Sequence, residues 1–153
     1  MIKNKDNKIC EFFINEFKKE ISYGTDVILD FIRCFESVLK NGTGSCYFEE
    51  KDKAYLFTIA NRNIFITEYL IRDTNVVHTI PIHRNLENLI KEFIQDVESD
   101  FNSWLNWFPV LDNRILEKRK IALLEGITFL KYEITKKEKN YRKEKELIEE
   151  FIY

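Results

Sequence analysis

His78 and His83 are the only residues of this sequence that could act as imidazole bases, and Cys10, Cys34 and Cys46 are its thiols. His78 falls in an expected strand and His83 in the turn that follows it. No cysteine or clear carboxylate spacing accompanies them, so they make a poor metal pair. Cys46 and His78 could form a nucleophile and base across a sheet, but the strands that carry them are not neighbours in the arrangement expected below. We therefore expect no catalytic residue, no metal site and no cofactor.

Two further groups of residues have a chemical and a structural interpretation. Cys10 and Cys34 come to a similar depth if the helices expected around them fold back on each other. They are then either a redox pair or two reduced thiols packed as small apolar groups, and the second is usual in a cytosolic chain. Asn41-Gly42-Thr43-Gly44 looks like a glycine-rich phosphate loop. It lacks a lysine and follows a helix rather than a strand, so we interpret it as a helix stop and a turn.

Four short apolar and aromatic runs between Gly44 and Ile82 determine the expected fold. The polar segments between them are so short that neighbouring strands must run antiparallel. The sequence therefore predicts a four-stranded antiparallel meander over residues 44–82. Pro81 cannot donate a ladder hydrogen bond, so the last strand is expected to lie at an edge or to end there. The expected strands are Gly44–Phe48, Lys53–Ala60, Ile64–Ile71 and Val76–Ile82.

Helical patterns precede and follow these strands. Apolar residues four apart from Ile9 to Ile21 are typical of an amphipathic helix. Asp26 can cap a second helix that Asn41-Gly42 stops, so residues 6–41 are expected to form two helices. A long helix is expected over residues 85–108, and charged helices over 112–152. The whole chain, residues 1–153, is thus expected to be one α+β domain: an N-terminal helical hairpin, the four-stranded antiparallel meander, and two or three C-terminal helices packed on the sheet.

The central strands of the meander are apolar or aromatic on both faces. Tyr55, Phe57 and Ile59 share one face, and Leu56 lies on the other with alanine and threonine neighbours. Antiparallel sheets usually leave one face polar. The second face is therefore either covered by helices of the same chain or is a surface that binds a partner.

Composition limits the partners that the chain can have. The formal net charge is −2, so no strong attraction to nucleic acid or to anionic lipid is expected. No apolar run approaches the roughly 20 residues that cross a bilayer, and the first residues do not form a secretory signal. We expect a cytoplasmic protein that binds neither nucleic acid nor membrane.

The order of helices, meander and helix resembles the small, variable α+β immunity proteins that neutralise bacterial contact-dependent or polymorphic toxins. The segment Gly42-Thr43-Gly44-Ser45-Cys46-Tyr47-Phe48 at the start of the meander and the abundance of lysine, asparagine and isoleucine add to the resemblance. It implies a non-enzymatic inhibitor, a monomer or weak dimer, that binds one cognate toxin domain directly and one to one. The partner that it implies is a nuclease-type effector domain.

Acidic side chains would steer the binding of a basic partner. The candidates lie at one expected hairpin and two strands further on: Glu49, Glu50, Asp52 and Asp73. Acidic residues in hairpin turns are also common because they keep the turn soluble, so each of these acids has both interpretations. Trp104 and Trp107 belong to an aromatic stripe that is either core or a partner anchor. The alternative function is a secretion chaperone that dimerises and holds an extended effector segment on apolar sheet surface. A stable homodimer would favour the chaperone, and a monomer the inhibitor.

Overall fold

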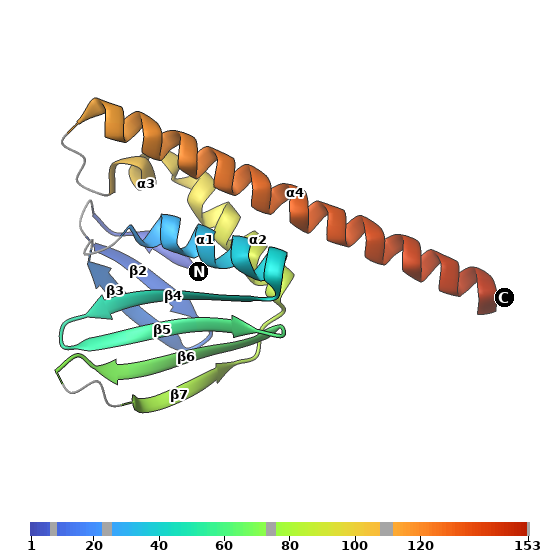
Figure 1. The fold of residues 1–153 in the computed structure, drawn as a ribbon, viewed down its shortest axis with the longest axis horizontal. Helices are drawn as coiled ribbons and strands as arrows, with labels where there is room; N and C mark the ends of the chain where they lie inside the picture. Colours follow the sequence, from blue (N-terminus) through green and yellow to red (C-terminus); the bar gives the residue numbers. More distant parts are fainter. Residues whose placement is uncertain (7–8, 23–25, 73–75, 108–111, 153) are drawn as a thin grey trace.

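The computed structural model describes residues 1–6, 9–22, 26–72, 76–107 and 112–152, and Figure 1 shows their arrangement. Strands β1–β3 form one antiparallel sheet and strands β4–β7 another. The strands are β1 (Ile2–Asn4), β2 (Ile9–Ile14), β3 (Phe17–Ser22), β4 (Thr43–Glu50), β5 (Lys53–Ala60), β6 (Asn63–Leu70) and β7 (Val76–Ile82). The helices are α1 (Val27–Asn41), α2 (Leu86–Ser99), α3 (Phe101–Trp107) and α4 (Asn113–Ile152).

The N-terminal segment is a three-stranded sheet, so the prediction of an N-terminal helical hairpin is wrong. A two-residue turn joins β2 to β3, and its Asn15 has a φ of 52°, a left-handed conformation that asparagine tolerates. The helix prediction was based on the four-residue spacing of the apolar residues Ile9, Phe13, Phe17 and Ile21. The side chains of β2 with almost no exposure are two residues apart instead: Cys10, Phe12 and Ile14. A sheet buries these residues on one face, whereas a helix would not.

The second predicted N-terminal helix is present as α1. Asp26 caps its first turn by accepting a hydrogen bond from the Leu29 amide, and Gly42 ends it with a φ of 82°. Asn41-Gly42-Thr43-Gly44 is thus a helix stop that leads into β4, as predicted. A Cβ atom on Gly44 would lie 2.3 Å from the Cys34 carbonyl oxygen, so glycine lets β4 approach the backbone of α1.

The predicted meander is confirmed. Strands β4–β7 pair in chain order, all antiparallel, and β7 with Pro81 lies at an edge. Tight turns join the first three strands, with positive φ angles at Lys51 in the first turn and at Asn61 and Arg62 in the second. The predicted alternation also holds, because Tyr55, Phe57 and Ile59 are fully buried. We call the face that carries them the inner face.

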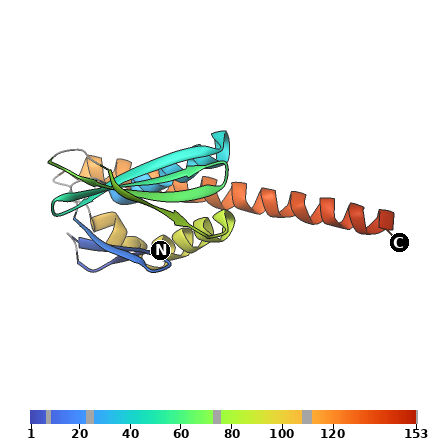
Figure 2. The same cartoon turned by 90° about the horizontal axis from the view of Figure 1, so that it is seen from below.

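The core fills the space between the inner face, the three-stranded sheet and α1. The ring of Phe12 on β2 lies 5.3 Å from that of Phe31 on α1, 5.1 Å from Phe48 on β4 and 6.0 Å from Phe57 on β5, measured between centroids. Such pairs add about 0.5–1.5 kcal/mol each beyond the burial of their area. Figure 2 shows the two sheets on opposite sides of the body. One face of the meander is therefore covered by strands as well as by helices.

The helix expected over residues 85–108 is divided in two. Asn85 caps α2 by accepting a hydrogen bond from the Asn88 amide, as the sequence predicts. Asp100 leaves helical geometry with a φ of −136° and separates α2 from α3. The charged C-terminal segment is one helix, α4, of 40 residues. It packs on the body through Leu123, Ile127, Leu130 and Ile134, while its C-terminal end projects beyond the body (Figures 1 and 2).

Arg119 fastens α4 to two other helices. Its guanidinium donates two hydrogen bonds to the Asp26 carboxylate, at 2.8 and 3.1 Å, and thereby holds the residue that caps α1. It also donates to the carbonyl oxygens of Trp104 and Leu105 in α3, at 2.8 and 2.9 Å. Only 6% of Arg119 is exposed. A planar donor group with several N–H bonds suits this position, and lysine could not replace all of them.

Removing this guanidinium should destabilise the protein strongly. We expect Arg119→Met to lower the free energy of unfolding by about 3 kcal/mol, because Asp26 and two carbonyl oxygens lose their donors in a largely buried place. Urea denaturation followed by circular dichroism would measure the loss. Arg114→Met, at an exposed position in the first turn of the same helix, is the matched control and should change stability by no more than about 0.5 kcal/mol. Equal effects of the two changes would contradict this role of Arg119.

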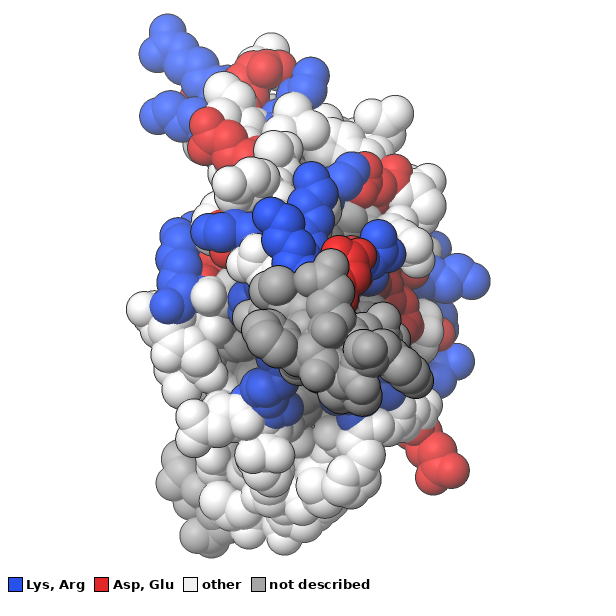
Figure 3. Space-filling model, turned by 90° about the vertical axis from the view of Figure 1, so that its right-hand side faces the viewer, with Lys and Arg blue, Asp and Glu red and all other residues white. Residues whose placement is uncertain are grey.

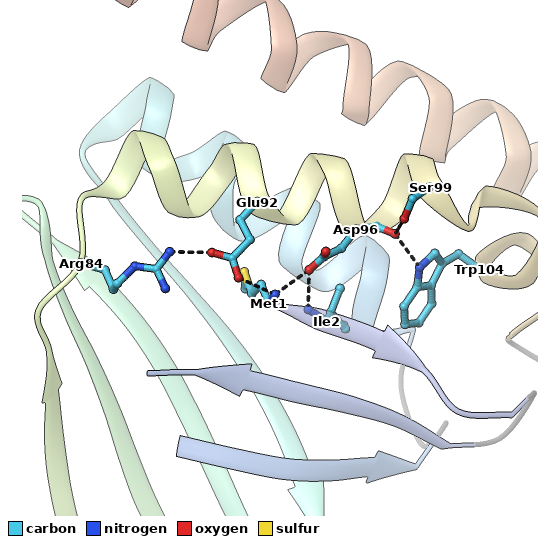
Figure 4. Close-up of polar contacts among 7 residues, drawn as sticks. All are labelled: Met1, Ile2, Arg84, Glu92, Asp96, Ser99 and Trp104. Atoms are coloured by element: carbon cyan, nitrogen blue, oxygen red, sulfur yellow. Dashed lines mark hydrogen bonds and ion pairs between the residues drawn. The ribbon is translucent and has the colours of Figure 1, made fainter. Parts of the chain in front are cut away.

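The first strand is attached to α2 by charged groups (Figure 4). The α-amino group of Met1 lies 2.7 Å from Glu92 Oε1 and 2.5 Å from Asp96 Oδ2, and the Ile2 amide also donates to Asp96. Arg84 contacts the other oxygen of Glu92 at 2.5 Å. Partial burial acts to raise the pKa of Glu92, but the hydrogen bonds from Met1 and Arg84 outweigh it, and the net pKa is lowered.

The stabilising effect of Glu92 should therefore disappear in acid. A carboxylate with a lowered folded-state pKa contributes stability above its unfolded value of 4.5, and the contribution is lost as the pH falls through the folded-state value. We expect Glu92→Gln to cost about 1 kcal/mol near neutral pH and much less near pH 3. Urea denaturation at the two pH values would measure this. A cost that stays constant between them would contradict the assignment, and Glu117→Gln at an exposed position of α4 is the control.

Candidate partner-binding surface

The face of the four-stranded sheet opposite the core, here called the outer face, is not covered by any element of the described residues (Figures 1 and 2). Cross-strand pairing places Tyr47, Leu56 and Thr67 in one row, and Thr58 and Phe65 in the next. Tyr69 belongs to a third row beside Ala54. Tyr47 is 43% exposed, whereas Leu56, Phe65 and Tyr69 are half-buried by their neighbours. Partly exposed aromatic and apolar side chains thus share this face with threonine and alanine.

Acidic residues border this surface at the turn between β4 and β5. Glu49 points to the outer face, where it accepts a hydrogen bond of 2.5 Å from Tyr47 Oη. This hydrogen bond, with a smaller effect of burial, raises the pKa of Tyr47 to about 12. Asp52 is exposed in the turn itself. Asp73, the fourth predicted acid, lies outside the described residues.

Glu50 lies on the other side of the same hairpin and faces the core. Its neighbours on the inner face include Tyr55 and Glu68, and the Glu68 carboxylate is held by Lys53 at 2.9 Å. Burial first, and then the charges of Glu68 and Glu50, raise the pKa of Tyr55 to about 12. The predicted acids are therefore divided between two faces. Glu49 and Asp52 are available to a partner at the outer face, and Glu50 is not.

Trp104 and Trp107 lie inside the body. Both are almost completely buried, and their ring centroids are 6.1 Å apart. The indole N–H of Trp104 donates to the Asp96 carbonyl oxygen at 3.4 Å. Of the two interpretations that the sequence allows for this aromatic stripe, the structure thus shows these two residues in the core.

The residues considered for catalysis are not brought together. Cys46 is buried on β4 and His78 is exposed on β7, at opposite edges of the sheet. Three strand spacings of about 4.8 Å separate them, far beyond hydrogen-bond reach. His83 is exposed just after β7. Within the described ranges, no three histidine, cysteine, aspartate or glutamate residues are grouped so that they could hold a metal ion.

All three cysteines are buried free thiols. Burial raises the pKa of Cys10 to about 12 and that of Cys34 to about 12. Burial, together with the proximity of Cys34 and Asp30, also raises the pKa of Cys46. Thiols in such surroundings remain protonated near neutral pH, and a protonated thiol is a poor nucleophile.

Comparisons of the chain with protein-family models, with curated proteins and with solved structures found no match. No described helix combines the length and the apolar composition that a bilayer crossing requires. The outer face must therefore be interpreted from its own chemistry. Sequence reasoning identified a second apolar face of the sheet, but it did not name Tyr47, Leu56, Phe65 and Tyr69 as site residues. The period-two alternation of β5 and β6 was the signal that could have named them.

The burial of the thiols gives a direct test of their state. We expect the folded protein to react with a thiol reagent near pH 8 at least about a hundredfold more slowly than a free cysteine. Burial keeps the reagent away from the thiols and also disfavours their ionisation to the reactive thiolate. After denaturation three thiols per chain should react rapidly, and the absorbance of the released reagent group would give their number. Rapid reaction of one thiol in the folded state would contradict this assignment. Fewer than three after denaturation without reductant would show a disulfide.

Proposed function

We propose that this protein is a non-enzymatic inhibitor that binds a cognate bacterial toxin domain directly and one to one, as immunity proteins do. The observation that supports the proposal most is the uncovered outer face of the four-stranded sheet. A single-domain protein rarely exposes large apolar side chains side by side unless they meet another molecule. Here Tyr47 is exposed, and the half-buried Leu56, Phe65 and Tyr69 lie on the same face of the neighbouring strands.

The composition of the outer face suits protein recognition. Aromatic residues at the centre of a patch and charged residues at its rim are the usual anatomy of a protein–protein interface. Tyrosine loses little side-chain entropy when it is bound and offers both an apolar ring and a hydroxyl group. These side chains project from paired strands, so they are already ordered before binding. A partner would therefore meet a rigid, largely apolar surface with a polar border.

The acidic border favours a basic partner. Nucleases bind phosphate groups and therefore carry lysine and arginine around their active sites. Glu49 and Asp52 at the edge of the outer face would attract such a surface and would set its orientation. Each exposed charge contributes little to affinity alone. The apolar residues are thus expected to supply most of the binding energy. The acids are expected to increase the association rate and to orient the partner.

A secretion chaperone remains the second candidate, because β7 is an exposed edge strand with which an extended segment of an effector could pair. Two features of this edge oppose strand addition. Pro81 lacks the N–H that a new strand would need, and the register shift between Glu68 and Tyr69 bends the pairing of β6 with β7. The outer face is therefore the better candidate for the binding surface.

The proposal predicts that a charge placed in the centre of the outer face will abolish protection. We expect Leu56→Lys to weaken binding to the toxin encoded beside this gene by at least about tenfold, because a central apolar contact is replaced by a charge that must lose its water. Calorimetric titration of the purified pair and growth of cells that co-express it would measure the effect.

Ile121→Lys on α4 is the matched control, because Ile121 is an exposed apolar residue remote from the sheet. It should protect as the unchanged protein does, and both variants should keep their melting temperature. Full protection by Leu56→Lys would show that the outer face is not the binding surface. Lack of any protection by the unchanged protein against the neighbouring gene product would contradict the inhibitor function itself.

A further inference from the structure

The side of α4 that is turned away from the body carries apolar residues. Ile121, Leu124 and Tyr132 are 53%, 47% and 63% exposed, whereas the solvent side of a surface helix is normally charged or polar. Figures 1 and 2 show that α4 runs along the outside of the body, and no described element covers this side. The buried residues of α4 lie on its opposite side: Arg119, Leu123, Ile127, Leu130 and Ile134.

Seven exposed residues form one stripe along this side, which we call the α4 stripe. At about 100° per residue, all seven fall within an arc of about 80°. The steps between them are four, three, four, four, three and four residues. The mean step of about 3.7 residues is close to one helical turn of 3.6, so the stripe runs nearly straight along α4. Its members are Glu117, Ile121, Leu124, Thr128, Tyr132, Thr135 and Lys139.

The steps follow the same order in both directions from Thr128, the middle residue of the stripe. A second copy of α4 in the reverse direction therefore places a stripe residue opposite every stripe residue of the first copy. In an antiparallel pair centred on Thr128, Leu124 meets Tyr132 of the second copy, and Ile121 meets Thr135. Thr128 meets the same residue of the second copy, and its small side chain lets the two helices approach closely.

The two ends of the α4 stripe have opposite charges. Glu117 and Lys139 are exposed, and neither forms an ion pair with a described residue. An antiparallel pair brings each Glu117 beside Lys139 of the other copy, whereas a parallel pair would place like charges together. Charged side chains of both signs lie around the upper part of the molecule, where α4 runs (Figure 3). Such a mixture does not favour nucleic acid or an anionic membrane as the partner of this side.

We propose that the α4 stripe is the interface of a weak homodimer, in which the α4 helices of two copies pack antiparallel about a twofold axis at Thr128. The interface contains the contact of Leu124 with Tyr132 twice and the pair of Glu117 with Lys139 twice. Because the stripe points away from the body, the two bodies lie on opposite sides of the helix pair. The outer face stays free, and the inference does not rest on the proposed function.

The dimer is expected to be weak. The stripe is about 33 Å long, and a width of about 10 Å on each copy gives roughly 660 Å² in all. This area is below the roughly 1,200 Å² of standard interfaces, so we expect a Kd of about 100 μM. At a few micromolar the chain is then largely monomeric, and Ile121 and Tyr132 are open to solvent. The dimer also differs from that of a secretion chaperone, because the sheet takes no part in it.

Sedimentation equilibrium of the full-length chain, from about 10 μM to about 1 mM at low salt, tests the apolar contact. Leu124→Lys should raise the Kd at least about tenfold, because the dimer loses both contacts with Tyr132. Ile115→Lys is the matched control, because Ile115 is 56% exposed but lies about 120° around the helix from Ile121 and outside the stripe. This variant should dimerise as the unchanged chain does.

Exchange of the two end charges tests the antiparallel arrangement. Glu117→Lys alone and Lys139→Glu alone each place like charges together at both ends of the helix pair, and should raise the Kd at least about fivefold at low salt. The variant with both changes restores opposite charges and keeps the net charge. It should dimerise with a Kd within about twofold of that of the unchanged chain, and about 500 mM salt should reduce the differences among the variants.

Three results would overturn the proposal. One is an unchanged chain that stays monomeric up to about 1 mM at low salt. Another is a dimer that Leu124→Lys leaves intact, because it would then use another surface. The third is a lack of effect of the single charge changes, or a failure of the double exchange to restore dimerisation, since either would rule out the antiparallel arrangement. All the substituted residues are exposed, so unchanged melting curves are expected and would exclude misfolding as the cause.

Discussion

The contact of Phe12 with the rings of α1 and of the meander is the interaction on which the rest of the structure depends. It joins the three-stranded sheet to Phe31, Phe48 and Phe57, and so fills the inner face of the four-stranded sheet at β4 and β5. Helices α2 and α4 then pack around this core rather than across the sheet. The outer face is left open because none of the described helices packs across it.

Hydrogen bonds and ion pairs hold the outer elements of the body in place at two positions. Arg119 ties α4 to the cap of α1 and to the end of α3, and the charged groups around Glu92 and Asp96 tie β1 to α2. Both lie on the side of the inner face, away from the outer face. The body can therefore present the outer face at one place and the α4 stripe at another, with no shared residue.

The local elements could be predicted from the sequence where their signals are unambiguous. Tight turns at Lys51 and Asn61, together with period-two alternation, specify the meander, and Asp26, Gly42 and Asn85 mark helix ends. The N-terminal sheet was missed because its apolar residues satisfy a four-residue spacing as well as alternation. Only contact with Phe31 and Phe48, which lie far along the chain, decides between the two. The interruption at Asp100 has no glycine or proline to announce it.

The candidate site was predictable only in part, for a related reason. Alternation reveals that the sheet has two apolar faces, but not which one the rest of the chain covers. It likewise cannot tell that Glu49 faces outward while the next residue, Glu50, faces the core, until the register with β5 is known. Trp104 and Trp107 are equally suited to a core and to an interface. Their burial depends on how α3 packs beneath α4, which no local pattern reports.

The central claim, that the outer face of the sheet is open to solvent in the free chain, is tested most directly by oxidative footprinting of tyrosine in the purified protein. Mass spectrometry would give the modification rate at each tyrosine, with exposed Tyr132 on α4 as the internal reference. The account predicts that Tyr47 reacts at a rate close to that of Tyr132, that Tyr69 reacts more slowly, and that buried Tyr55 is protected. Protection of Tyr47 and Tyr69 to the level of Tyr55 would contradict it.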